Sequence, residues 1–479
     1  MNASVSKSSL TALDWLQFEE SSAESIYAPG FIQPWGMLLV LQEPDLKIVQ
    51  ISDNAEHFLG RSPESCLGQS LEKLFSQSQI KSLKDALTQD QLERCHLLEF
   101  KPRQQPDRSL PTLKGTLHRT PTALILELEP QSGESKPAFQ FYSHLQTATL
   151  NLRTATSLTQ LAQTLAREMK AITGFDRVMI YRFETDNHGV VIAEAKEPHI
   201  ESYLGLHFPA IDIPPPARTL FCRNRIRQIP DLRYPPAHLI PSHHPVTEAP
   251  LDLSDCLLRG VSPCHVEYLQ NMEVGASLTI SLIDDKHLWG LIACHHSSPR
   301  RVDYDTRKTC EFLGQFASIE LVRQQELDLN HYREQVKTIQ DRLQQAFHQQ
   351  ANFIQPVLLQ NAPQLLEVVR AEGAAIVLGD EISLVGQTPP IAAVRELLTW
   401  LATLKQQEIY FTNCLSRPYP PARAWKESAS GMLMISVVLH QQSYHLIWFR
   451  PEQIQRVNWA GDPNSAIVFD PNGAARLTP

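Results

Sequence analysis

The stretch Arg259-Gly-Val-Ser-Pro-Cys-His-Val-Glu-Tyr-Leu-Gln-Asn-Met272 places a thiol and an imidazole side by side after a proline. We expect residues 265–272 to form a helix, with Cys264 near its start. A helix N-terminus and a neighbouring histidine both favour the thiolate, so Cys264 is a candidate nucleophile. The plainer alternative is a small buried thiol, which is the usual fate of an unpaired cysteine.

A second pair of this kind, Cys294-His295-His296, follows the expected strand 288–293. Two cysteines and several histidines raise the alternative of a zinc site. Adjacent residues on a strand point to opposite faces, so such a pair chelates poorly. We therefore assign no metal ligands.

Asp212 lies within Phe208-Pro-Ala-Ile-Asp-Ile-Pro-Pro-Pro216. A carboxylate among prolines and apolar side chains is poorly hydrated, so it finds donors or its pKa rises. A simple turn or N-cap aspartate is the alternative.

Several arginines are candidates to hold an anionic ligand, since guanidinium groups bind carboxylates bidentately. They are Arg227, Arg259 and either Arg223 or Arg225. Solvated surface arginines are the alternative. With the aromatics Tyr181, Phe208 and Tyr268, these residues suit a conjugated, carboxylate-bearing cofactor held covalently.

Length and composition indicate the number of domains and exclude several classes of protein. The chain has 479 residues, which at about 150 residues per domain predicts three domains. The net charge of −9 argues against a nucleic-acid surface or an anionic membrane as partner. Eight cysteines without a C-x-x-C pair exclude a disulfide scaffold. The polar N-terminus does not fit a signal peptide, and no apolar run is long enough to span a membrane, so we expect a cytoplasmic protein.

The pattern of strands and helices predicts an α+β protein of three modules, each with a central antiparallel sheet. After an N-terminal segment (1–25), the first module covers 26–130, with strands at 37–41, 48–52 and 123–128 and a helix at 78–87. A Pro/Ser/Gly linker follows at 130–137. The second module covers 139–321, with a helix at 155–173, strands at 178–183 and 190–193, and a hairpin of 276–283 with 288–293. Its Pro-dense stretch 209–250 is expected to be an ordered loop or lid without regular structure.

A long helix is predicted next, because residues 315–355 contain no glycine or proline. Seven side chains at near-heptad spacing form a seam that either bridges two domains or pairs with a second helix: Val322, Leu329, Tyr332, Val336, Ile339, Leu343 and Ala346. The third module covers 353–479, with hairpins of 373–378 with 382–385 and 432–439 with 444–449. The second of these hairpins is similar in sequence to 277–291, which indicates a weak internal repeat of one fold.

These motifs together resemble the photosensory region of phytochromes, with PAS, GAF and PHY domains in that order. The resemblance covers residues 20–479 and rests on several stretches. They are Pro29-Gly-Phe-Ile-Gln-Pro34, Phe175-Asp-Arg-Val-Met-Ile-Tyr-Arg-Phe183, Leu204-Gly-Leu-His-Phe-Pro-Ala-Ile-Asp-Ile-Pro214, the 259–272 and 288–296 stretches, Trp448-Phe-Arg-Pro-Glu452 and Trp459-Ala-Gly-Asp-Pro463.

The resemblance implies a red/far-red photoreceptor that carries a linear tetrapyrrole (bilin) and signals by Z-to-E isomerisation at its C15 methine bridge. It implies covalent attachment at Cys264. No cysteine precedes Cys66, which disfavours biliverdin and favours phycocyanobilin or phytochromobilin. It also implies roles for the other site residues. His265 lies by the central pyrroles, Asp212 near the pyrrole nitrogens and His295 at the D-ring carbonyl. The propionates contact Arg227, Arg259, Ser262, Ser277 and Thr279. Tyr181 and Tyr268 line the cavity around the D-ring, Phe208 stands at a further D-ring position, and Ile213 is another chromophore-binding residue.

Several residues depart from the family's usual pattern. Ile211 replaces a serine, Phe208 a tyrosine and Trp35 a histidine, and the first two are expected to shift absorption or photoproduct stability. The sequence stops at Arg476-Leu-Thr-Pro479, within the expected tongue of the third module. The resemblance further implies a homodimer through the long helix and an output domain or response regulator outside this chain. No kinase motif is found, and autocatalytic bilin attachment is the one chemical step assigned. A PAS/GAF sensor of another small ligand, without photochemistry, is the alternative function.

Overall fold

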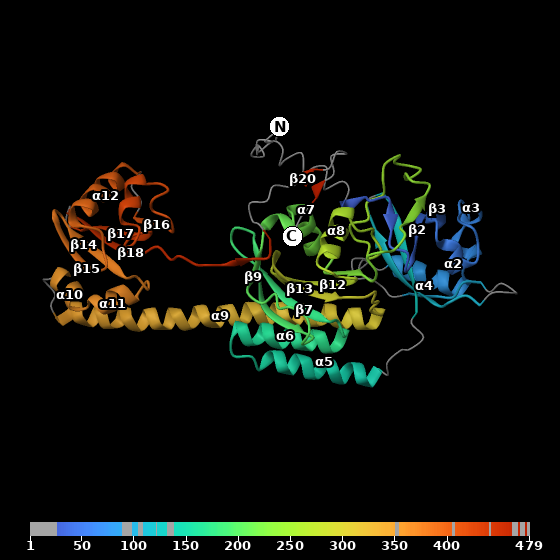
Figure 1. The fold of residues 1–479 in the computed structure, drawn as a ribbon, viewed down its shortest axis with the longest axis horizontal. Coiled ribbons are helices and arrows are strands. Elements are labelled where there is room, and N and C mark those ends of the chain that lie inside the picture. The colour runs from blue at the N-terminus through green and yellow to red at the C-terminus, as the bar shows by residue number, and fades with distance from the viewer. Residues whose placement is uncertain are drawn as a thin grey trace, which may run out of the picture. The chain divides into compact units, whose positions relative to one another are not determined.

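The computed structural model describes residues 26–88, 98–103, 109–120, 122–131, 138–349, 354–404, 408–439, 442–461, 468–469 and 475–476. The expected N-terminal segment 1–25, most of the linker 130–137 and most of the stretch after residue 461 lie outside these ranges. The chain divides into two compact units (Figure 1). The first comprises Met1–Gln324 with Val457–Pro479, and the second comprises Gln325–Arg456.

The first sheet of unit 1 has the strand order β1-β11-β3-β2-β6-β5-β4. Its strands are β1 (Phe31–Ile32), β2 (Met37–Gln42), β3 (Lys47–Ser52), β4 (Leu98–Phe100), β5 (Leu113–Arg119), β6 (Leu124–Pro130) and β11 (Ala237–Ile240). Beside it lie α2 (Ala55–Leu59), α3 (Pro63–Cys66), η1 (Leu71–Lys73) and α4 (Gln77–Thr88). Alternate residues of β2 face two separate cores. Met37 and Leu39 pack with the helices, and Leu38 and Val40 pack with the segment around 237–258.

The proline-dense stretch 209–250 was wrongly predicted to lack regular structure. It contains α7 (Pro215–Arg223), β10 (Ile226–Ile229) and β11. Strand β11 leaves the second module and joins the first sheet, where Leu239 pairs with Ser52 and Ala237 pairs with Ile32. The first two modules therefore share a sheet as well as an apolar core.

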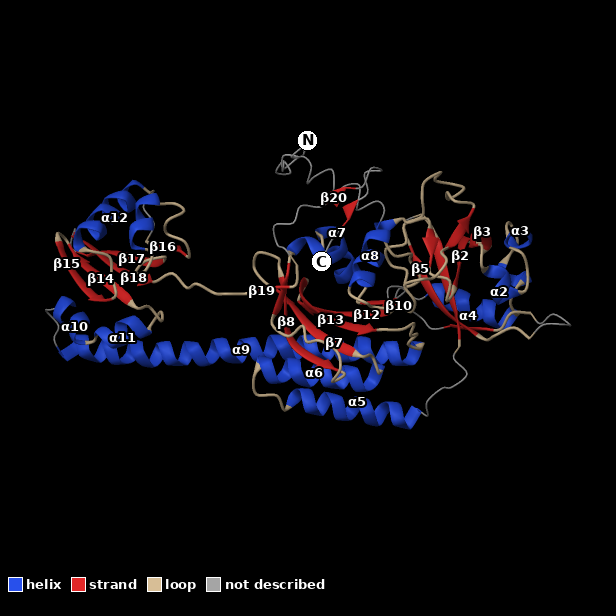
Figure 2. Ribbon diagram, in the orientation of Figure 1, coloured by secondary structure: helices blue, strands red, loops and turns tan. Residues whose placement is uncertain are grey.

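The second sheet of unit 1 has the order β10-β12-β13-β7-β8-β9-β19. Its further strands are β7 (Arg177–Phe183), β8 (Gly189–Lys196), β9 (Leu206–Phe208), β12 (Ala276–Asp284), β13 (His287–His296) and β19 (Asn458–Trp459). One face packs on α6 (Leu158–Thr173) and the start of α9 (Tyr304–Gln349), and α5 (Ala138–Arg153) packs against α6, as Figure 2 shows. The opposite face carries α7, η2 (Ala210–Asp212) and α8 (Pro263–Asn271). The residues predicted to form the site lie on this face.

Unit 2 contains a five-stranded antiparallel sheet of order β15-β14-β18-β17-β16. Its elements are α10 (Ile354–Gln360), α11 (Ala362–Glu367), β14 (Gly373–Leu378), β15 (Glu381–Gly386), α12 (Ile391–Thr403), β16 (Ile409–Thr412), η3 (Pro420–Trp425), β17 (Gly431–Leu439) and β18 (Gln442–Arg450). Read by chain order, β14 to β18 have the same sheet order as β7, β8, β10, β12 and β13. The topology therefore supports the internal repeat predicted from the hairpin sequences. Two short strands after this unit, β20 (Val468–Phe469) and β21 (Ala475–Arg476), pair with each other.

The long helix differs in extent and use from the prediction. It begins at Tyr304 rather than near residue 315, and its described part ends at Gln349. Residues of the predicted seam make contacts within unit 2 and are therefore not all available to a second helix. Ile339 is only 5% exposed, and the Tyr332 hydroxyl donates to the Val368 carbonyl oxygen at 2.8 Å. The exposed apolar positions earlier on the helix are Phe312, Ile319, Leu327 and Leu329. Within the described part of the chain, no helix is long and apolar enough to cross a membrane.

Candidate functional site

Strand register brings four of the predicted residues to one face of the second sheet. Arg227 lies opposite Thr279, and Ser277 lies opposite His295. Directly paired residues of an antiparallel sheet share a face, and so do residues two apart on a strand. Their neighbours Leu278 and Cys294 point the other way, into the helix-covered core.

Asp212 and Tyr268 meet across this face. Asp212 ends η2, and Tyr268 lies on α8, where its hydroxyl donates to Asp212 Oδ2 at 2.9 Å. Burial raises the pKa of Asp212 to about 6, although the hydrogen bond from Tyr268 opposes the rise. The poor hydration predicted from the surrounding prolines is therefore present, and the carboxyl group changes charge near neutral pH.

His265 follows Cys264 on the first turn of α8 and stacks on Tyr268, with ring planes 12° apart and centroids 6.3 Å apart. Its side chain is solvent-accessible, yet burial and then the charge of Arg227 lower its pKa to about 4. Protein groups around the ring, among them Arg227, thus disfavour the imidazolium although water reaches part of the side chain. At neutral pH the imidazole is uncharged and has one donor and one acceptor nitrogen to offer.

His295 is a half-buried histidine on β13. Burial, the charge of Arg177 and that of His265 lower its pKa to about 3, so the ring is neutral. Its Nδ1 atom is buried without a hydrogen-bond partner. An unpaired buried nitrogen costs free energy, and native structures nearly always satisfy such groups. This atom is therefore a position where a water molecule or a ligand can supply the missing partner.

Cys264 is the second residue of α8, after Pro263, and its side chain is half-buried. The predicted position at a helix N-terminus is confirmed. Ser262 is the N-cap residue, but its side chain makes no capping hydrogen bond. Cys264 lies in the first turn of α8, where the helix dipole favours a negative charge.

The two arginines brace the backbone around the site. Arg227 donates to the carbonyl oxygens of Leu257, Arg259 and Gly260 at 3.2, 2.6 and 2.9 Å. Burial and the charge of Arg259 lower the pKa of Arg227 to about 9. Arg259 donates through Nη1 to the Ile26 carbonyl oxygen at 3.0 Å, and its buried Nε atom has no partner. Arg223 instead pairs with Asp255, so it is committed elsewhere.

Two of the predicted aromatic residues, Tyr181 and Phe208, form one cluster with Ile213, whereas Tyr268 packs in a separate cluster with Val261 and Leu269. The Tyr181 and Phe208 ring centroids are 5.8 Å apart, and both side chains are less than 10% exposed. Burial, with the charge of Asp212, raises the pKa of Tyr181, so the phenol stays neutral. Gly189 is required beside it, because a Cβ atom there would lie 1.8 Å from Tyr181 Cζ.

Arg218 is a site residue that sequence reasoning missed. Its Nε and Nη2 atoms donate to the carbonyl oxygens of Ile213 and Ala210 at 2.7 and 3.1 Å, on either side of Asp212. Its guanidinium group also lies over the Phe183 ring, 4.6 Å from the centroid. The signal in the sequence was its place six residues after Asp212, in the first turn of the helix α7 that follows.

The face thus combines a thiol, two neutral imidazoles, a carboxyl group of shifted pKa, a buried and a half-buried arginine, and an aromatic cluster. The unpartnered His295 Nδ1 and Arg259 Nε call for a ligand with carbonyl or carboxylate oxygens. A linear tetrapyrrole carries both groups on a conjugated body, so the residues fit it.

Comparison with known proteins defines the class. The chain matches the models of the PAS fold over residues 21–131, the GAF domain over 157–319 and the phytochrome region over 336–479. It is 41% identical over 459 residues to cyanobacterial phytochrome B of Nostoc sp., covering 96% of this chain and 61% of that protein. It is 34% identical over 483 residues to a bacteriophytochrome of Xanthomonas campestris, covering 98% of this chain and 74% of that protein.

A solved structure agrees with this class. A bacteriophytochrome of the photosynthetic bacterium R. palustris matches with a TM-score of 0.87 at 34% identity, over 96% of this chain and 92% of that chain. The chain belongs to the phytochrome family. The predicted family and the α+β class with PAS, GAF and PHY modules are therefore confirmed. The chain spans about 60% of the length of the cyanobacterial relatives that it matches.

Proposed function

We propose that this chain is the photosensory part of a red/far-red photoreceptor and that it binds a linear tetrapyrrole covalently at Cys264. The observation that carries the proposal is the shared face of the second sheet and α8. There the Cys264 helix start, the Asp212–Tyr268 pair and the unpartnered His295 nitrogen lie together. The phytochrome relatives do not favour the alternative of a sensor without photochemistry.

Attachment uses the Cys264 thiol. Its sulfur bonds to an exocyclic alkene carbon of the A-ring and its proton goes to the bilin, so nothing is lost and no oxidant is needed. The helix start favours the attacking thiolate. A ligand with an A-ring vinyl or ethylidene group is required, and we favour phycocyanobilin, with phytochromobilin and biliverdin as the less favoured candidates.

The remaining residues hold and orient the ligand. In the tautomer with a proton on Nδ1, His295 donates a hydrogen bond to a ring carbonyl oxygen. Arg259 Nε–H donates a hydrogen bond to a propionate oxygen. Arg227 retains guanidinium protons beyond its three backbone contacts, and Ser277 and Thr279 stand beside it on β12. Ser262 at the start of α8 is free of a capping role.

When bound, the bilin supplies light absorption and Z-to-E isomerisation at C15. The protein supplies Asp212, whose hydrogen-bond partner or charge can change after the isomerisation. Asp212 has a pKa of about 6 and accepts a side-chain hydrogen bond from Tyr268, so it can change partner or charge at small cost. Tyr181, Phe208 and Ile213 form the apolar wall against which the moving ring turns.

We also propose the domain division 26–130, 139–321 and 353–479, joined by the long helix α9, and a homodimer formed through exposed positions of α9. An output domain or response regulator outside residues 1–479 is the expected partner. The chain itself is not proposed to be an enzyme beyond autocatalytic attachment.

Attachment is tested with Cys264→Ala in cells that make phycocyanobilin. We expect loss of the covalent, zinc-fluorescent band on a denaturing gel. Cys222→Ala is the matched control, because Cys222 is also half-buried and lies on α7. A persistent band in Cys264→Ala would overturn the attachment site. Absorbance spectra after alternating red and far-red light test the function, and a spectrum that does not change reversibly would refute it.

A further inference from the structure

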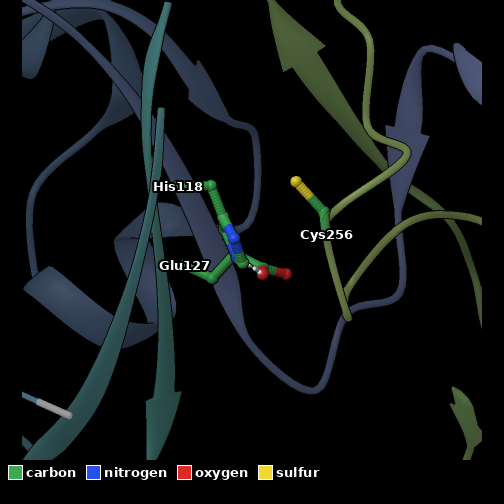
Figure 3. A group of neighbouring side chains, drawn as sticks. All are labelled: His118, Glu127 and Cys256. Atoms are coloured by element: carbon green, nitrogen blue, oxygen red, sulfur yellow. Dashed lines mark hydrogen bonds and ion pairs between the residues drawn. The ribbon is translucent and has the colours of Figure 1, made fainter. Parts of the chain in front are cut away.

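Three side chains with metal-binding atoms gather between the first module and the loop that leads to α8. They are His118 on β5, Glu127 on β6 and Cys256 (Figure 3). One atom of each lies within 4.8 Å of the others. In Figure 3 the histidine and the carboxylate come from neighbouring strands, and the thiol points toward them from the opposite side.

Sheet register explains the first two positions. His118 pairs with Ile125 and Thr116 pairs with Glu127, so His118 and Glu127 are diagonal neighbours on one face. Their side chains meet, with His118 Nε2 and Glu127 Oε1 2.6 Å apart. The Glu127 side chain is 5% exposed and that of His118 is 12% exposed.

The loop fixes the thiol relative to the carboxylate. Leu257 N donates to Glu127 Oε1 at 3.1 Å, and Leu258 N donates to Oε2 at 2.6 Å. These are the two residues directly after Cys256, which is fully buried among apolar side chains. No hydrogen bond to the Cys256 sulfur is found in the described part of the chain. The carboxylate is therefore oriented by backbone hydrogen bonds of its own, as metal-binding carboxylates are.

We propose that His118, Glu127 and Cys256 form a site for Zn²⁺. Imidazole, carboxylate and thiolate are the ligands that zinc takes, whereas Mg²⁺ and Ca²⁺ prefer oxygen alone. Three protein ligands and one water complete a tetrahedral site. The Zn²⁺ charge balances Glu127 and a Cys256 thiolate, so no net charge is buried. On binding, the metal takes the places of the thiol proton and of any proton on His118 Nε2, and these protons leave to solvent.

The geometry needs a modest adjustment. Zinc–ligand bonds of about 2.0–2.3 Å put tetrahedral ligand atoms about 3.4–3.7 Å apart. The His118–Glu127 contact must therefore open by about 1 Å, and the sulfur must approach by a similar distance. The His118 ring lies near the surface and has room to turn, since its side chain keeps some exposure. Zinc at this position would tie the first module to the loop that precedes Arg259 and Cys264.

The test is a Zn²⁺ titration of the full chain, produced without chromophore because a bilin itself chelates zinc. Equilibrium dialysis with metal analysis should give one tightly bound ion per chain. Co²⁺ in its place should give a thiolate-to-cobalt charge-transfer band. Cys256→Ser and His118→Gln should each weaken binding at least about 100-fold, because losing even a group that only orients a ligand costs about 10–100-fold. Cys66→Ser is the control, since Cys66 is a buried cysteine of the module that carries His118 and Glu127, and it should bind as the parent chain does.

Equal zinc binding by both variants, or no stoichiometric binding by the folded parent chain, would overturn the site and leave only a buried His118–Glu127 pair. Circular dichroism checks that each variant is folded. If Cys256→Ser does not fold, the cobalt spectrum of the parent chain decides the question: a missing charge-transfer band refutes thiolate ligation.

Discussion

Removing the Tyr268 hydroxyl is expected to raise the pKa of Asp212. In the chain before chromophore loading, burial raises this pKa to about 6 and the hydrogen bond from Tyr268 holds it down. Tyr268→Phe deletes that donor and leaves the ring in place. The carboxylate then loses its favourable contact while burial is unchanged, so the neutral acid is favoured over a wider pH range.

The magnitude follows from the strength of such a bond. A hydrogen bond to a charged group is worth about 1.5–3 kcal/mol, and one pKa unit corresponds to about 1.4 kcal/mol. The variant's pKa should therefore rise by about 1–2 units. At pH 7 the ionised fraction should fall from about 90% to between about 50% and 10%.

Infrared difference spectroscopy of the protonated carboxyl band as a function of pH measures this midpoint. Tyr181→Phe is the control, because Tyr181 influences Asp212 through space without a hydrogen bond. Its midpoint should stay close to that of the parent chain. A Tyr268→Phe midpoint at or below the parent value would show that the hydrogen bond from Tyr268 does not hold the pKa of Asp212 down.

Four further outcomes follow from the structure. Because the folded pKa of Asp212 lies above its ordinary 3.8, its contribution to stability is complete below about pH 4 and is lost as pH rises through about 6, which urea unfolding at several pH values measures. Gly189→Ala should destabilise the chain by about 1–3 kcal/mol, since its Cβ meets the Tyr181 ring; Gly431→Ala, with its nearest contact at 3.5 Å, is the control in urea unfolding. Arg218→Gln should lose about 1–3 kcal/mol with its carbonyl and ring contacts, measured in the same way. Ile319→Arg, at a position 66% exposed on α9, should shift a dimer to monomer in analytical ultracentrifugation, whereas Glu326→Arg should not.

The hydrophobic pattern and the turn residues of the sequence predicted those strands whose formation depends on neighbouring residues in the chain. Strands β2, β7, β12 and β18 are apolar runs with turns beside them, and their positions agree with the prediction within a few residues. Strand β11 could not be found in this way. Its four residues, Ala-His-Leu-Ile, lie between prolines, and its partner Ser52 is far away in sequence. The pairing that makes it a strand is a tertiary contact, which no local pattern records.

The candidate site shows the same division. The shifted pKa of Asp212 was predictable because its hydrophobic neighbours adjoin it in sequence. Its donor Tyr268 was assigned to the site, but the bond between them was not predicted, since 56 residues separate the two. His118, Glu127 and Cys256 were not singled out at all. Two strands and a distant loop bring them together, and no one of the three residues stands out in the sequence.

The backbone of 257–260 shows why the first module belongs to the site. Glu127 accepts the N–H groups of Leu257 and Leu258, and Arg227 donates to three carbonyl oxygens of the same segment. Residues near the start of the first sheet complete the pattern, because Gln33 N donates to the Leu258 oxygen and Gly260 N donates to the Phe31 oxygen. A loop that ends four residues before Cys264 is thus held from both sides. The start of α8, and with it the direction of the Cys264 thiol, depends on the first module as well as on the second.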